Sequence, residues 1–290
     1  MIKKKDITLL IQGRRDNTSL QTLRDNGHLF KEVIYSTWSG QTKEFKDQKI
    51  VWVSSKLPNV ENKHNLANIY YQVVSTLNGL KKVKTKYVLK HRSDEKYNNV
   101  SLILSSFNPN KILCANIFFR PIDYCPYHIS DHFFLAKTED LIKTFGNLKK
   151  YIDSSKDEFG ILNNQHPPEQ LISLFYLDAV SSLSIKELLI SGDNVDYVFD
   201  IMKRYIDIID VELLKPYLIK HNHLSRVIDD FEKAHSTESM YMSKTTKRFS
   251  KVGYIKCISD IKKKPPISLS KRIKDFFKSL LSQNKTILGK

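Results

Sequence analysis

Residues 85–95 read T-K-Y-V-L-K-H-R-S-D-E, and this stretch decides the fold. Its first half, Thr85 to Lys90, is a short run that is typical of a buried strand. The strand leads directly into the polar cluster at residues 91–95. A buried strand that ends in such a cluster is typical of a parallel sheet that presents functional side chains at the carboxyl ends of its strands.

The segments before this stretch predict further strands and helices in alternation. Short apolar runs bounded by Gly, Pro or polar residues are typical of strands, and apolar residues spaced three and four apart are typical of helices. The resulting β-α-β-β-α-β order predicts an α/β fold with a mostly parallel sheet and helices on both faces. The predicted strands are 7–11, 30–36, 49–54 and 85–90, and the predicted helices are 20–26 and 65–80.

Polar clusters follow all four of these strands. Gln12-Gly13-Arg14 follows the first strand, Ser36-Thr37-Trp38 the second, and Ser54-Ser55 the third. Because ligands of such sheets bind at the carboxyl ends of the strands, we predict that these clusters and residues 92–95 converge on one site. Trp38 is a candidate for stacking on a base, although a buried aromatic is the commoner outcome.

The second half of the chain predicts more helix than strand. Pro167 and Pro168 followed by Glu169 are good starting signals for a helix. From residue 184 to residue 234 the pattern is helical and amphipathic, so we divide the chain into an α/β domain at 1–183, a helical extension at 184–243 and a basic tail at 244–290. The elements predicted after residue 98 are a helix at 100–107, a strand at 112–120, and helices at 138–145 and 171–180; a loop with Pro121 and Pro126 leads into the segment H-I-S-D-H-F-F-L-A at 128–136.

Positive charge is concentrated in the tail. The chain has 47 Lys and Arg against 31 Asp and Glu, a net of +16. Residues 244–290 hold 14 of the basic residues and two of the acids, a net of +12, which leaves +4 for the first 243 residues. Phe and Leu side chains form one apolar stripe within this charge, which predicts an amphipathic helix on an anionic membrane surface, with packing on the protein's own core as the alternative. The residues predicted to contact the membrane are Lys271, Arg272, Ile273, Phe276, Phe277 and Leu280.

The sequence also predicts where the protein resides. No apolar run is long enough to span a bilayer, and the apolar stretch after the basic N-terminus is too short for a signal peptide. The three cysteines show no C-x-x-C spacing, so they indicate neither a zinc site nor a disulfide framework. We therefore expect a cytoplasmic protein, held peripherally on the cytoplasmic face of the inner membrane.

Three acids are candidates for chemistry. Asp94 follows a buried strand beside Arg92 and Glu95, where a carboxylate suits Mn or Mg, but it could equally begin the next helix. Since position 92 is Arg, this segment contains no paired D-x-D. Asp131 in I-S-D-H-F-F and Glu169 in P-P-E-Q are candidates for a general base or an acceptor contact. A turn residue and a first-turn helix acid are the respective alternatives.

Three blocks of sequence resemble the WavE family of lipopolysaccharide-synthesis proteins. The blocks are N-x-x-x-x-x-Y-Q-V-V-S-T-x-N-G-L with K-Y-V-L-K-H-R-S-D-E at 65–95, Y-H-I-S-D-H-F-F-L-A-K-T-E-D-L at 127–141, and P-P-E-Q at 167–170. Three blocks in the same order are more specific than any one of them, and the resemblance covers about residues 5–180. It implies a glycosyltransferase with a GT-A-type fold that binds a nucleotide sugar.

The resemblance also implies roles for individual residues. Asp94 takes the place of the acid that faces a metal and the diphosphate, while Asp131 and Glu169 face the acceptor. We therefore predict sugar transfer from a nucleotide-sugar donor to a lipopolysaccharide, lipooligosaccharide or capsule acceptor, with Mn or Mg at the donor site. The residues predicted to bind the donor are Gln12, Gly13, Arg14, Ser36, Trp38, Lys90, Arg92 and Asp94.

Two other functions are compatible with the sequence. The lack of a paired D-x-D is compatible with a non-catalytic scaffold for glycan assembly that has a degenerate GT-A fold. The net charge is compatible with nucleic-acid binding, but its confinement to the tail and the lack of a recognition motif argue against a nucleic-acid partner.

Overall fold

A seven-stranded mixed sheet forms the centre of the protein, in the order β3-β2-β1-β4-β7-β6-β8. Neighbouring strands are parallel except at β7, which pairs antiparallel with both β4 and β6. The strands are β1 Ile7–Gln12, β2 Glu32–Trp38, β3 Ile50–Ser55, β4 Tyr87–Arg92, β6 Ile112–Ala115, β7 Phe133–Lys137 and β8 Ile206–Ile209. The computed structural model describes residues 3–41, 50–60, 66–116, 125–154, 157–162, 166–214 and 217–219.

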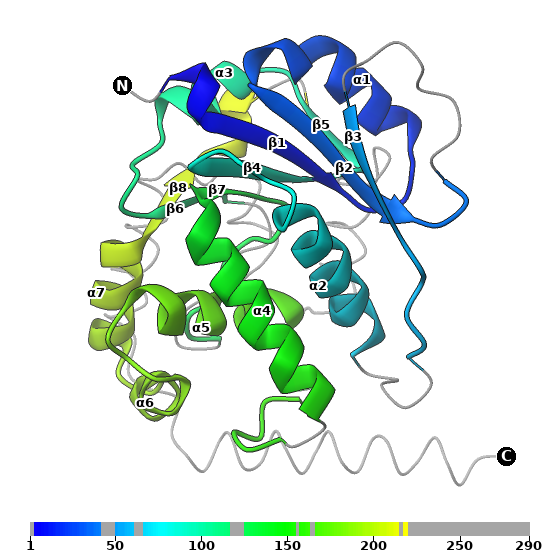
Figure 1. The fold of residues 1–290 in the computed structure, drawn as a ribbon. Coiled ribbons are helices and arrows are strands. Elements are labelled where there is room, and N and C mark those ends of the chain that lie inside the picture. The colour runs from blue at the N-terminus through cyan, green and yellow to red at the C-terminus, as the bar shows by residue number, and fades with distance from the viewer. Residues whose placement is uncertain are drawn as a thin grey trace, which may run out of the picture.

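Helices cover both faces of this sheet (Figure 1). Both faces need cover because successive residues of a strand point to opposite faces and those of β1 are apolar. Leu9 and Ile11 pack in the core on one face, and Leu10 packs in the core on the other. The predicted α/β fold with a mostly parallel sheet is confirmed. One face carries α1 Asn17–Asn26 and α3 Val100–Ser105, and the other carries α2 Ala67–Leu80, α4 Thr138–Ser154, α5 Pro168–Val180, α6 Ile185–Ser191 and α7 Val195–Tyr205.

Short elements complete the described chain. A second, two-stranded sheet pairs β5 Glu95–Tyr97 with β9 Tyr217–Ile219 in antiparallel register. Because β5 begins three residues after β4 ends, the chain turns sharply at the end of β4. The 3-10 helices are η1 Lys4–Asp6, η2 Gly27–Leu29 and η4 Val211–Leu214.

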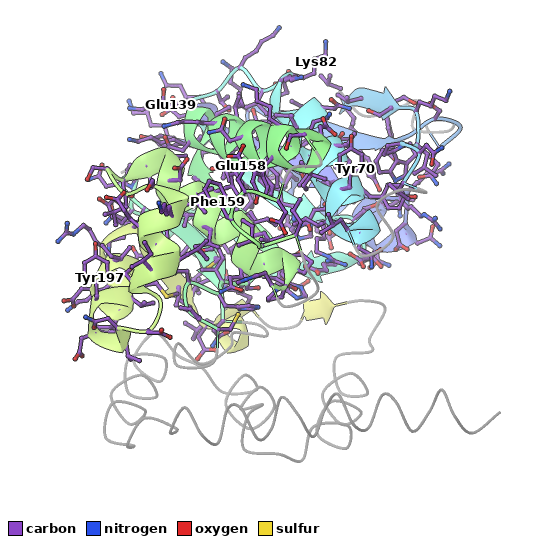
Figure 2. The ribbon with its side chains drawn as sticks, turned by 90° about the horizontal axis from the view of Figure 1, so that it is seen from below. Tyr70, Lys82, Glu139, Glu158, Phe159 and Tyr197 are labelled. Atoms are coloured by element: carbon purple, nitrogen blue, oxygen red, sulfur yellow. The ribbon has the colours of Figure 1, made fainter. Side chains whose placement is uncertain are left out.

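Polar contacts join the helices α2 and α4, in addition to their shared apolar core. The hydroxyl of Tyr70 on α2 donates to Asp153 on α4 at 2.6 Å, and Lys149 of α4 forms an ion pair with the same carboxylate. Figure 2 looks onto this side of the molecule, with Tyr70 and Tyr197 of α7 on opposite sides of it. These contacts join α2 to α4 on one face of the sheet.

The strand order creates a switch point between β1 and β4. From β1 the chain continues outward to β2 and β3, and then returns to place β4 on the other side of β1. The last residues of the two strands, Gln12 and Arg92, are directly paired. In open α/β sheets, ligands bind outside the carboxyl ends of the strands at such a point.

Several predicted boundaries change in the structure. β4 continues to Arg92 instead of ending at Lys90, because it keeps its register with β1 beyond the apolar run. The helix predicted at 138–145 continues to Ser154 as α4, because the buried Leu148, Tyr151 and Ile152 extend its apolar face and Gly146 has only a modest cost in a helix interior.

The helical prediction for 184–234 is wrong at Tyr217–Ile219, which form β9, and at residues 206–209. This segment forms β8, because its four buried residues pair in parallel with β6 at the far edge of the main sheet. The division of the chain into parts ending at residues 183, 243 and 290 stays a prediction, and the tail lies outside the described residues. Among the helices that the structure describes, none has the length and apolar character needed to cross a membrane.

Candidate functional site

The ends of β1, β2 and β4 are tied together at the switch point. The backbone N–H of Gly13 donates to the carbonyl of Ser36 at 3.1 Å, and the N–H of Ser93 donates to the carbonyl of Gln12 at 3.0 Å. Gly13 has φ +133°, and a Cβ built on it would lie 2.3 Å from Oγ of Ser93. Only glycine permits both this backbone conformation and this close approach. The ends of β1, β2 and β4 therefore converge as predicted, and their role as a binding site stays a prediction.

Helix α2 adds polar side chains to the same edge of the sheet. The side chain of Gln12 donates to Oγ of Ser75 at 2.9 Å, and the hydroxyl of Ser36 donates to the Ser75 carbonyl at 2.6 Å. One turn nearer the start of α2, the Gln72 amide donates to Oδ2 of Asp131 at 2.8 Å. Gln72 and Ser75 were not predicted from the sequence, because polar residues on the side of an amphipathic helix opposite its apolar stripe normally face solvent.

A cluster of charged residues lies just beyond the end of β4, and we call Arg92, Asp94, Glu95, Asp131 and His132 the charged cluster. Arg92 lies at its centre, with hydrogen bonds from Nε and Nη2 to the two carboxylate oxygens of Asp94 at 3.1 and 3.0 Å. Nε also lies 3.0 Å from Oε1 of Glu95, and Nη1 lies 3.7 Å from Oδ2 of Asp131. Arg92 and Asp94 are 25% and 29% exposed, whereas the other acids are buried.

Glu95 and His132 form the buried side of the charged cluster. Nδ1 of His132 lies 2.5 Å from Oε1 of Glu95, and the hydroxyl of Tyr97 donates to Oε2 at 2.9 Å. Because both oxygens of Glu95 are engaged, its carboxylate is held in one orientation beneath Arg92. Glu95 was not predicted as a site residue from the sequence, where it stands out only as a neighbour of Asp94.

The acids of the charged cluster are held in their ionised form. Burial alone would raise the pKa of Asp131, but the positive charges of Arg92 and Lys90 lower it below its ordinary range. The pKa of Glu95 is also lowered, because its interactions with His132 and Arg92 outweigh its burial. For Asp94, the hydrogen bonds and charge of Arg92 outweigh burial and lower the pKa of the carboxyl.

Lys90 lies beneath this cluster and is fully buried. Its ammonium group donates to the backbone carbonyl of Asp131 at 2.8 Å. Burial lowers the pKa of Lys90 to about 8, although Asp131 acts to raise it. In this arrangement Lys90 positions the segment that carries Asp131 instead of presenting its amine at the surface.

The P-P-E-Q segment lies against the same loop. At the start of α5, the side chain of Gln170 donates to the carbonyl of Pro126 at 2.8 Å. Oε2 of Glu169 lies 4.0 Å from Nε2 of His128, three residues before Asp131. Of the two acids that were predicted to face an acceptor, Asp131 therefore lies in the loop at 125–132 and Glu169 lies against it.

Two predicted donor-binding residues lie in different surroundings. Trp38 is 7% exposed and packs edge to face on Tyr71 of α2, which is the buried core position that was the alternative to base stacking. Arg14 lies exposed in the loop after β1, and its backbone carbonyl accepts a hydrogen bond from Tyr35. The predicted membrane-contacting residues of the tail lie outside the described residues.

The arrangement around Asp94 does not fit a divalent cation. Both oxygens of Asp94 are engaged by Arg92, and the same guanidinium faces Glu95 and Asp131. A cation that took these oxygens as ligands would lie against a fixed positive charge. Within the described part of the chain, no group of three or more His, Cys, Asp or Glu side chains has the arrangement of a metal site. Asp94 as a ligand of Mn or Mg stays a prediction from sequence.

Comparison with known proteins identifies a family. Residues 16–172 match the family described as WavE lipopolysaccharide synthesis. No curated protein matches the sequence. Among solved structures, the apo-form glycosyltransferase GlyE of Streptococcus pneumoniae TIGR4 aligns with 75% of this chain at 13% identity and a TM-score of 0.41, and the chain spans 55% of the length of that protein.

Proposed function

The chain belongs to the WavE lipopolysaccharide synthesis family. We propose that it is a glycosyltransferase. The donor is a nucleotide sugar, and the acceptor is a lipopolysaccharide, lipooligosaccharide or capsule glycan at the cytoplasmic face of the membrane. The observation that carries the proposal is the charged cluster at the switch point between β1 and β4, where α/β sheets bind their ligands.

The donor side of the proposed site is formed by the ends of β1, β2 and β4. Gly13 and Ser93 bring the backbones of two strand ends together, and Arg14 follows in the same loop. Arg92 and Asp94 are the partly exposed members of the charged cluster, so they are accessible to the phosphates and the sugar. Positive charge placed where the leaving group becomes negative lowers the barrier to transfer.

The acceptor side is formed by Asp131, with Glu169 as a second candidate on α5. In the proposed step, the bond between the sugar C1 and the phosphate oxygen breaks, and the nucleotide leaves with the electron pair. An acceptor hydroxyl oxygen forms the new bond to C1, and its proton passes to the carboxylate of Asp131. The carboxylate is ionised and so can accept the proton, but its lowered pKa makes it a weak base, and the role rests on its position beside Arg92.

Nucleotide binding is the direct test of the donor site. We expect one of UDP, GDP, CMP or dTDP to raise the unfolding temperature, because a ligand that binds only the folded state stabilises that state. The bound nucleotide then selects the sugar donor for a transfer assay on acceptor extracted from an LPS- or capsule-producing strain. A protein that no nucleotide stabilises, and that transfers no sugar, would instead support the role of a non-catalytic assembly scaffold.

A further inference from the structure

Arg92 occupies the place where a glycosyltransferase with a paired D-x-D would have its first acid. The segment reads R-S-D-E at 92–95, so the spacing of the pair is kept and its first member is a cation. In the folded protein this cation lies among three carboxylates, those of Asp94, Glu95 and Asp131. The position that would attract a divalent cation therefore already holds a guanidinium.

We propose that Arg92 itself binds the diphosphate of the donor, and that this binding needs no divalent cation. The inference rests on the proposed function, since it concerns the same donor site. Arginine suits this role because its planar group carries five N–H donors in a fork that matches phosphate oxygens and keeps its charge at every physiological pH. The disagreement between the predicted metal at Asp94 and the observed contacts of Arg92 is the basis of the proposal.

The contacts of Arg92 leave part of its guanidinium available. Glu95 anchors Nε from the buried side, and Asp94 binds Nε and Nη2 from the partly exposed side. Within the described residues, the contact of Nη1 is with Asp131 at 3.7 Å, which is longer than a hydrogen bond. Nη1 and the outer edge of Nη2 can therefore donate to phosphate.

Asp94 is the partner that competes with the donor. Asp94, Glu95 and Asp131 bring three negative charges to the site, against the two positive charges of Lys90 and Arg92. Of the three acids, Asp94 is the most exposed, so an incoming phosphate meets this carboxylate on Arg92 first. If Arg92 binds the diphosphate directly, neutralising Asp94 should strengthen binding in the absence of metal. If Asp94 instead binds a metal that holds the diphosphate, the same change should abolish binding.

Calorimetry of the full-length protein with UDP, GDP, CDP and dTDP tests the proposal, each measured in EDTA and again in Mn. For the nucleotide that binds, we expect dissociation constants within about threefold in the two buffers, since Arg92 supplies the positive charge. In EDTA, Asp94→Asn should tighten binding by about tenfold, because an amide does not compete for the guanidinium as a carboxylate does. Asp200→Asn, an exposed change on α7, is the matched control and should leave binding as in the wild type.

The outcomes separate the inference from the proposed function. Binding that occurs only in Mn, or that Asp94→Asn abolishes in a protein with unchanged circular dichroism, overturns the role of Arg92 but leaves a donor site in place. If none of the nucleotides binds in either buffer, the proposed function fails and the inference fails with it. Equal binding in both buffers together with tighter binding by Asp94→Asn supports the assignment of Arg92.

Discussion

Asp131 is a buried acid that stays charged because basic residues of β4 accompany it. Its side chain is 6% exposed, with Oδ2 held by Gln72 and facing Arg92, and Lys90 holds its backbone carbonyl. An isolated carboxylate in such a place would take up a proton, since burial disfavours the charged form. The neighbours reverse that outcome and leave a fixed negative charge at the proposed acceptor side.

Replacing Asp131 with Asn should therefore separate transfer from donor binding. The amide keeps the size of the side chain but cannot take a proton from an acceptor hydroxyl, so we expect the transfer rate to fall by about 10²–10⁴-fold. The dissociation constant for the nucleotide should not rise, because the change removes a negative charge that faces Nη1 of Arg92 at 3.7 Å and leaves the proposed donor contacts in place. Steady-state transfer kinetics and calorimetry on the same preparation measure the two quantities.

Asp200→Asn is the matched control for this prediction, because it makes the same chemical change at an exposed position of α7. Its transfer rate should equal that of the wild type. Transfer by Asp131→Asn at the wild-type rate would remove Asp131 from the chemistry, and Glu169→Gln would then be the variant to measure.

The lowered pKa values of the acids also predict how stability depends on pH. The ordinary pKa of an aspartate is 3.8, and that of Asp131 is lower in the folded protein, so the unfolded chain binds more protons as the pH falls through this range. The stabilising contribution is complete above the unfolded value and is lost as the pH falls through the folded value. Urea unfolding between about pH 5 and about pH 2 should show a steeper loss of the free energy of unfolding in the wild type than in Asp131→Asn. Parallel curves for the two proteins would contradict this account.

At the scale of elements, strands with continuous apolar runs were predictable and strands defined by their neighbours were not. β1 and β4 each contain an apolar run that predicts a strand. Ile206–Ile209 follows an amphipathic helix directly, and it forms β8 because it pairs with β6 at the edge of the sheet. The polar contacts of α2 are likewise set by packing. Gln72 meets Asp131, 59 residues later, only because β7 returns beside β4.

Two helical glycines provide a matched test of how tightly α2 packs on the sheet. A Cβ at Gly79 would lie 2.4 Å from a methyl of the buried Leu10 and 3.0 Å from Cβ of Ser36, whereas a Cβ at Gly146 of α4 would meet nothing within 4 Å. We expect Gly79→Ala to destabilise the protein by about 1–3 kcal/mol through overpacking. Gly146→Ala should stabilise it by about 0.5–1 kcal/mol, since alanine favours a helix interior.

Urea unfolding of the two alanine variants measures both free energies under the same conditions. Since Ser36 also bonds to Ser75, Gly79→Ala should weaken nucleotide binding as well as stability. Stabilisation by both substitutions would mean that α2 lies farther from β1 and β2 than the structure describes.

At the scale of the whole molecule, three blocks of sequence meet around one loop. Residues 65–95 supply Gln72 and the charged cluster's basic centre, residues 127–141 supply Asp131, and the P-P-E-Q segment supports the loop from α5. Their meeting at the strand ends was predictable, because parallel strands bring their carboxyl ends to one edge. The contact of Arg92 with Asp131 was not, because spacing gives no distance between side chains of separate blocks.

The basic tail is the part of the whole molecule whose role rests on sequence alone. If residues 269–281 form an amphipathic helix at a membrane surface, the protein should sediment with vesicles that contain anionic lipid. Each Lys or Arg near the surface contributes about 1 kcal/mol of attraction, so the binding should weaken as salt is added. Phe276→Ser with Phe277→Ser should reduce the partition coefficient by at least about tenfold, because burying each phenylalanine contributes about 1.5–3 kcal/mol. Ser279→Ala with Ser282→Ala keeps the charge and the apolar stripe and should bind as the wild type does. Equal sedimentation of the phenylalanine variant, or tight binding to nucleic acid that survives these changes, would contradict a membrane role for the tail.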